Sequence, residues 1–75
     1  MDLSTIKHGH TVLVEVRITG NRCGYLSDGL YRATRGPREI HFRNVATGSG
    51  TLEQIRMLAV FQRNGWLSIE PKGDR

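Results

Sequence analysis

Hydrophobic and polar residues alternate along residues 11–18, Thr-Val-Leu-Val-Glu-Val-Arg-Ile. Every second residue from Val12 to Ile18 is apolar and β-branched, while Glu15 and Arg17 occupy the opposite phase. A period of two is typical of a strand with one buried face. Residues 11–18 are therefore predicted to form a strand whose valines face a core.

Several later segments share this alternation, or the turn residues that bound a strand. Strands are predicted over four of them, at residues 23–26, 30–34, 39–45 and 66–70. The pair Asp28-Gly29 is a strong hairpin signal. Pro37, which has no N–H to donate to a ladder, marks the turn before residue 39.

A helix is predicted over residues 52–63, after a glycine-rich break at residues 46–50. Thr51 with Gln54 fits a capping box, and Asn64-Gly65 fits a left-handed C-terminal stop. At helical spacing, one apolar stripe is expected from Leu52, Ile55, Leu58 and Ala59.

Together these elements predict an α+β fold, a small antiparallel sheet of three to five strands packed on one helix in β-β-β-(β)-α-β order. We expect a single domain over residues 11–70, with a loose N-terminal arm at 1–10 and a charged tail at 71–75. The face of the sheet away from the helix is expected to be open to solvent and mostly basic. It would carry Leu13, Glu15, Arg17, Arg32, His41 and Arg43.

The element order over residues 11–63, three antiparallel strands followed by a packing helix, resembles the small DNA-binding domains of the AP2 and integrase arm-binding type. The resemblance rests on element order alone, because no motif of those families matches between Arg32 and Arg43. It implies that the sheet, and not the helix, contacts the DNA groove.

The length of 75 residues corresponds to one domain, and at this size a core supplies only about 3–5 kcal/mol without a disulfide, metal or partner. The single cysteine, Cys23, excludes an internal disulfide and fits a reducing compartment. The start of the chain lacks the pattern of a secretory signal, and the longest apolar run, residues 57–61, is too short to span a membrane. We expect a cytoplasmic protein without membrane contact.

Arginine dominates the charge of the chain. The formal net charge is +4, and residues 17–43 carry six arginines against only Asp28 and Glu39. Guanidinium groups match phosphate and carboxylate groups in geometry, so a basic sheet face and hairpin indicate nucleic acid or an acidic nucleoprotein as partner. The candidate contact residues are Arg17, Arg32, Arg35, Arg38, His41 and Arg43. GC-rich codon usage is the alternative explanation for this arginine content.

No pattern in the chain indicates catalysis. The carboxylates are scattered, and His8, His10, Cys23 and His41 lack the paired spacing of a metal site. The glycine-rich residues 47–51 lack the lysine of a P-loop. We expect a protein that is not an enzyme and has no cofactor, metal or small-molecule substrate.

A second set of residues allows a different function. Met57 and Phe61 lie outside the main helical stripe, and together with Trp66 of the last predicted strand they are candidates for a protein-partner or dimer surface. The alternative is therefore a phage or mobile-element accessory protein that inhibits a host machine by occluding a surface, as anti-CRISPR proteins do. A homodimer through helices or edge strands is the third possibility.

Overall fold

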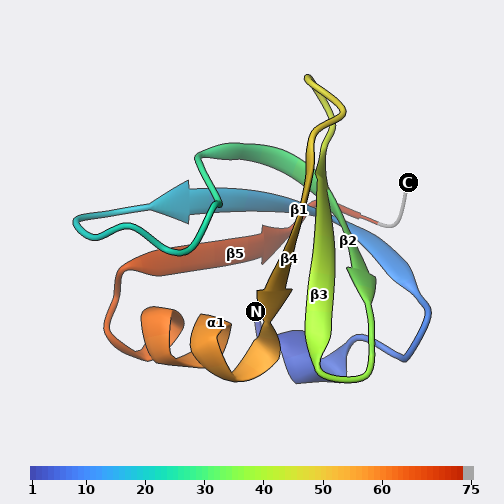
Figure 1. Cartoon of the computed structure of the whole chain (residues 1–75), viewed down its shortest axis with the longest axis horizontal. Coiled ribbons are helices and arrows are strands. Elements are labelled where there is room, and N and C mark those ends of the chain that lie inside the picture. The colour runs from blue at the N-terminus through green and yellow to red at the C-terminus, as the bar shows by residue number, and fades with distance from the viewer. Residues whose placement is uncertain (74–75) are drawn as a thin grey trace.

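The computed structural model describes residues 1–73 and contains a five-stranded antiparallel sheet in the order β4-β3-β2-β1-β5 (Figure 1). Along the chain the elements are the short 3-10 helix η1 (Leu3–Thr5), β1 (Thr11–Ile18), β2 (Gly29–Arg35), β3 (Glu39–Asn44), β4 (Gly50–Gln54), α1 (Ile55–Arg63) and β5 (Leu67–Pro71). This arrangement confirms the predicted α+β class, an antiparallel sheet with one helix.

The valines of β1 face the core, as their alternation predicts. Val14 and Val16 are 0% and 1% exposed, and the strand register places them opposite Tyr31 and Ile69. Tyr31 meets Phe42 of β3 edge to face, with 5.9 Å between the ring centroids. The same core includes Leu3, Ile6, Cys23, Leu26, Ala33, Ile40, Leu58 and Leu67.

The helix α1 begins at Ile55, three residues later than predicted, because residues 50–54 form the edge strand β4. Leu52 pairs with His41 of β3 and is 64% exposed, so it is not part of a helical stripe. Of the predicted stripe only Leu58 is fully buried. The capping-box prediction is wrong, because pairing with β3 outweighs the local signal at Thr51 and leaves this residue inside the strand.

The glycine-rich segment between β3 and β4 is a hairpin turn, and not a break before a helix. The side chain of Asn44 accepts hydrogen bonds from the backbone N–H groups of Ala46 and Thr47 at 2.9 and 3.0 Å. Gly48 adopts a φ of +79° and donates its N–H to the carbonyl of Asn44 at 2.8 Å. This hairpin projects beyond the rest of the sheet (Figure 1).

The predicted stop at Asn64-Gly65 is confirmed. Gly65 has a φ of +77° and donates to the carbonyl of Gln62 at 3.1 Å, and Trp66 donates to that of Phe61 at 3.0 Å. These two bonds form a Schellman motif. The rings of Phe61 and Trp66 pack 6.4 Å apart at this point, so the motif also turns the chain back into β5.

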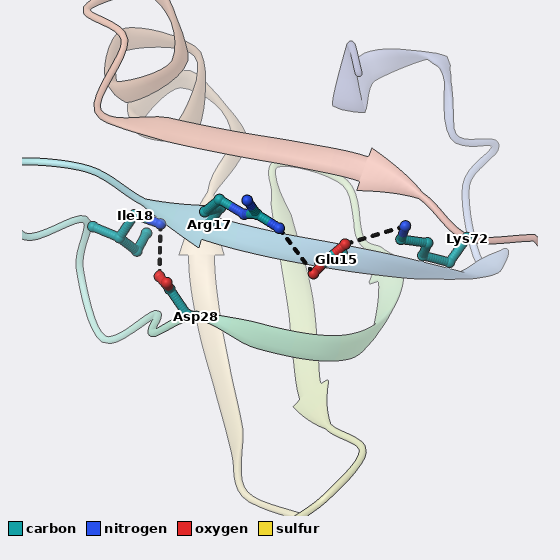
Figure 2. A network of polar contacts seen from close by, with 5 residues as sticks. All are labelled: Glu15, Arg17, Ile18, Asp28 and Lys72. Carbon is teal, nitrogen blue, oxygen red and sulfur yellow. Dashed lines mark hydrogen bonds and ion pairs between the residues drawn. The ribbon is translucent and has the colours of Figure 1, made fainter.

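Between β1 and β2 the chain forms a loop over residues 19–28, where a strand at residues 23–26 was predicted. Cys23 and Leu26 are buried in the core, which explains the apolar positions without a strand. Asp28 closes the loop by accepting a hydrogen bond from the N–H of Ile18 at 2.7 Å (Figure 2). Asp28-Gly29 is thus the end of a long loop and not the turn of a tight hairpin.

The N-terminal segment belongs to the core. Leu3 and Ile6 are 2% and 5% exposed, so residues 1–10 do not form a loose arm. The apolar side chains at these two positions cover core surface that the single helix leaves open. At the other end of the chain, the N–H of Lys72 donates to the carbonyl of Leu13 at 2.8 Å and continues the pairing of β5 with β1. Of the tail expected at 71–75, residues 74–75 lie outside the described chain.

Among residues 1–73, no helix is long and apolar enough to cross a membrane, since the single α-helix has nine residues.

Candidate functional site

The face of the sheet opposite the core is called the outer face here. Side chains alternate along each strand, and the register aligns those of neighbouring strands, so this face is made by one phase of every strand. It carries Thr11, Leu13, Glu15, Arg17, Leu30, Arg32, Thr34, Glu39, His41, Arg43, Leu52, Gln54, Ser68 and Glu70. Four of the six predicted contact residues, namely Arg17, Arg32, His41 and Arg43, therefore lie on a common surface.

Arg32 of β2 and Arg43 of β3 are direct cross-strand neighbours on the outer face. Both are exposed, and the ion pairs within residues 1–73 include neither of them. Arg43 donates from Nη1 to the carbonyl of Gly48 at 3.1 Å, which leaves most of its guanidinium donors without a protein partner. Like charges directly opposite each other destabilise a sheet, so the fold alone does not account for this pair. An anion placed between them would bind both guanidinium groups.

Arg17 is neutralised within its own strand. Glu15 accepts from Arg17 through Oε2 at 3.3 Å and pairs with Nζ of Lys72 through Oε1 at 3.2 Å (Figure 2). Lys72 first and Arg17 second lower the pKa of the Glu15 carboxyl, through hydrogen bonding and charge. The β1 side of the outer face is therefore close to balanced in charge, and the unbalanced charge lies at Arg32 and Arg43.

His41 extends this basic region toward β4. It lies on β3 opposite Thr34 on one side and Leu52 on the other. A Cβ atom on Gly50 would lie 2.8 Å from Nε2 of His41, so the imidazole lies across the backbone of β4 at a position that only glycine leaves open. His41 is half-buried.

Arg35 and Arg38 do not lie on the outer face, because Arg35 ends β2 and Arg38 lies in the predicted turn between β2 and β3. The guanidinium of Arg35 points to the other side and donates to the carbonyls of Ser4, Ile6 and Gly36 at 3.1, 2.9 and 3.0 Å. It therefore ties the N-terminal segment to the β2–β3 turn. The carbonyl of Arg38 accepts from the N–H of Ile55 at 2.9 Å, so this turn packs beside the start of α1 and is not a free tip.

The predicted partner surface at Met57, Phe61 and Trp66 is divided by the fold. Phe61 and Trp66 are partly buried against the core, where they form the stop of α1. Met57 is 43% exposed. The two aromatic side chains thus have a structural role, and their apolar character alone does not indicate a partner.

Residues 1–73 bring no three metal-ligating side chains together. His8 and His10 lie in the segment before β1, Cys23 lies in the 19–28 loop and His41 lies on β3. Cys23 is fully buried, with Sγ 3.6 Å from the carbonyl of Asn21 and 3.7 Å from that of Trp66. Burial raises the pKa of its thiol, and the charge of Glu53 raises it further. At neutral pH the sulfur is therefore a protonated core atom and not a nucleophile.

Glu53 is a buried charged residue that the sequence interpretation missed. It is 9% exposed, and its Oε2 accepts from the N–H of Tyr25 at 2.8 Å and from Oγ1 of Thr51 at 3.2 Å. Gly24 has a φ of +63° and lies so close to this carboxylate that a Cβ would overlap it. Glu53 therefore holds the 19–28 loop against β4. Reading residues 50–54 as a strand would have placed Glu53 on the core face.

Comparisons with protein-family models, with curated proteins and with solved structures find no match to this chain. The resemblance to the AP2 and integrase arm-binding domains thus receives no support from solved structures. Its element order is also incomplete, since four strands precede the helix and a fifth follows it.

Proposed function

We propose that this protein is a small non-enzymatic binding module that docks on nucleic acid through the outer face of its sheet. The observation that carries the proposal is the opposed pair of Arg32 and Arg43, two exposed guanidinium groups without a carboxylate partner in residues 1–73. A phosphodiester backbone supplies anionic oxygens to both groups. His41 lies on the same face two residues from Arg43 in β3, and Arg17 lies on this face in β1.

The composition of the outer face favours backbone contacts over base stacking. Tyr31 and Phe42 are buried in the core, and the strands place no Phe, Tyr or Trp on the outer face. Single-strand binding proteins use such rings as stacking platforms. We therefore expect duplex binding with little sequence preference, in which phosphate contacts supply most of the affinity.

A salt titration with a matched pair of variants tests this proposal. The double variant R32A/R43A removes the opposed pair, and R22A/R63A removes two other exposed arginines with the same loss of net charge. Binding to a fluorescein-labelled DNA duplex of about 20 base pairs is measured from about 50 to 200 mM salt. We expect R32A/R43A to reduce the slope of log K against log[salt] by about 2, and R22A/R63A to leave it nearly unchanged. Equal slopes for the two variants, or no binding by the wild type, would refute the proposal.

A second candidate function is occlusion of an acidic protein surface by the same face. It is favoured by the apolar side chains beside the arginines, since Leu30 and Leu52 are 43% and 64% exposed. Such a protein would act as an accessory inhibitor of a larger machine. Pull-down from nuclease-treated lysate with wild type and with L30N/L52N separates the two functions. A stoichiometric protein that only the wild type retains would favour occlusion.

A further inference from the structure

A hollow lies where η1, the turn between β2 and β3, and the start of α1 come together. Its volume is about 590 Å³, which is within the range of ligand pockets in proteins. Its apolar wall is formed by Pro37, Ile55 and Ala59. Arg35, Arg38 and Arg56 supply its positive charge. We call it the basic groove.

Backbone and side-chain bonds fix the walls of the basic groove. Arg35 connects the N-terminal segment to the turn through its three bonds to carbonyl oxygens. The N–H of Gly36 donates to the carbonyl of Glu39 at 2.8 Å, and the N–H of Ile55 donates to the backbone carbonyl of Arg38 at 2.9 Å. The groove is therefore preformed, and a ligand would not have to order it.

Two of the three arginines keep most of their guanidinium donors available. Arg56 makes one bond, from Nε to Oε1 of Gln54 at 3.3 Å. The side chain of Arg38 has no hydrogen bond or ion pair with any other part of residues 1–73. Asp2 also lines the groove, but its carboxylate accepts from the N–H and Oγ of Ser4 at 3.0 and 2.7 Å. The groove thus combines an apolar wall with two available cationic groups.

We propose that the basic groove binds an acidic peptide segment that carries an apolar side chain. Carboxylates of the peptide would pair with Arg38 and Arg56, and its apolar side chain would cover Ile55 and Ala59. Nucleic acid fits the groove less well, because its lining contains no aromatic ring for base stacking, whereas the apolar wall of Pro37, Ile55 and Ala59 matches an apolar side chain. Gln54 borders both this site and the outer face, but the two sites share no arginine, so this proposal does not depend on the nucleic-acid proposal.

The test measures fluorescence anisotropy with a labelled peptide that contains leucines among glutamates, and with a matched peptide in which every glutamate is glutamine. R38A/R56A removes the two available arginines, and R22A/R63A is the control of equal charge loss. A59W fills the groove without changing charge, since Ala59 is exposed on α1. Circular dichroism confirms that each variant is folded. R32A/R43A and a labelled DNA duplex are also measured, so that binding at the groove can be distinguished from binding at the outer face.

We expect the wild type to bind the glutamate peptide and not the glutamine peptide. R38A/R56A and A59W should each weaken this binding by about tenfold or more, and R22A/R63A and R32A/R43A by less than about threefold. Equal weakening by R38A/R56A and R22A/R63A would overturn the proposal, because net charge alone would then explain binding. No binding of the glutamate peptide by the wild type would also overturn it. Loss of duplex binding in R38A/R56A but not in R32A/R43A would reassign the groove to nucleic acid.

Discussion

The two faces of the sheet use charged residues in opposite ways. On the core face, Arg35 and Glu53 are engaged by backbone groups and hold the N-terminal segment and the 19–28 loop in place. On the outer face, Arg32 and Arg43 lie opposite each other without a carboxylate partner in the described chain. Charge in a basic protein therefore has to be assigned residue by residue, because only part of it is available to a ligand.

The largest expected effect is loss of the core. Phe42 is fully buried and meets Tyr31 edge to face, so Phe42→Ala should cost about 3–5 kcal/mol, which is enough to unfold a domain of this size. Leu52→Ala, on the outer face, should cost less than about 0.5 kcal/mol. Urea denaturation followed by circular dichroism measures both. Similar losses for the two variants would mean that the outer face is also a packing surface.

The Gly24 position tests the role of Glu53 in holding the loop. Gly24→Ala forces a Cβ into the Glu53 carboxylate at a positive φ and should cost about 1–3 kcal/mol. Gly20→Ala is the matched control, because Gly20 has a φ of +92° but no neighbouring atom within 4 Å of its Cβ position. The difference between the two unfolding free energies isolates the overlap with Glu53. No difference would show that this contact does not hold the loop.

Arg35 and Arg38 provide the next comparison. Arg35→Ala removes donors from three carbonyl oxygens and should lower the free energy of unfolding by about 1–2 kcal/mol. Arg38→Ala removes no such bond and should change it by less than about 0.5 kcal/mol. Thermal unfolding of the two variants gives the answer. If Arg35→Ala proved neutral, the assignment of Arg35 to the fold would be wrong.

The smallest effect concerns Glu15. Its folded-state pKa is lowered by Lys72 and Arg17, so its contribution to stability is present at neutral pH and is lost as the pH falls below the ordinary value of 4.5. The melting temperatures of wild type and Glu15→Gln should therefore differ at neutral pH. The difference should shrink as the pH falls below 4.5. High salt should reduce the difference at neutral pH, because the pair is exposed to solvent. A difference that stays constant with pH would contradict the ion pairs.

Local patterns predicted much of the fold. The alternation at residues 11–18 identified β1 and its buried face, and Asn64-Gly65 identified the end of α1. The strand β4 could not be predicted in the same way, because Thr51 and Gln54 carry a helical capping signal and only pairing with β3 shows that they form a strand. The pairing of β4 with β3 across the hairpin turn is an interaction that the capping signal does not reveal.

Only part of the candidate site could be predicted, because alternation places residues on a face but does not reveal tertiary contacts. Alternation placed Arg17, Arg32, His41 and Arg43 on one face. The position of Arg35 in the sequence does not show that its guanidinium binds Ser4 and Ile6, residues about thirty positions earlier. Nor does the position of Glu53 show its contact with the loop at Tyr25. Both contacts require the closed tertiary structure.

Thermal unfolding with and without a DNA duplex tests most directly whether the Arg32–Arg43 pair is kept for a ligand and not for the fold. For R32A/R43A without duplex, we predict a melting temperature equal to or slightly above that of the wild type, because a like-charge pair has been removed. With duplex at low salt, the melting temperature of the wild type should rise and that of the variant should not. A fall in the melting temperature of the free variant, or an equal rise for both proteins on adding duplex, would contradict the account.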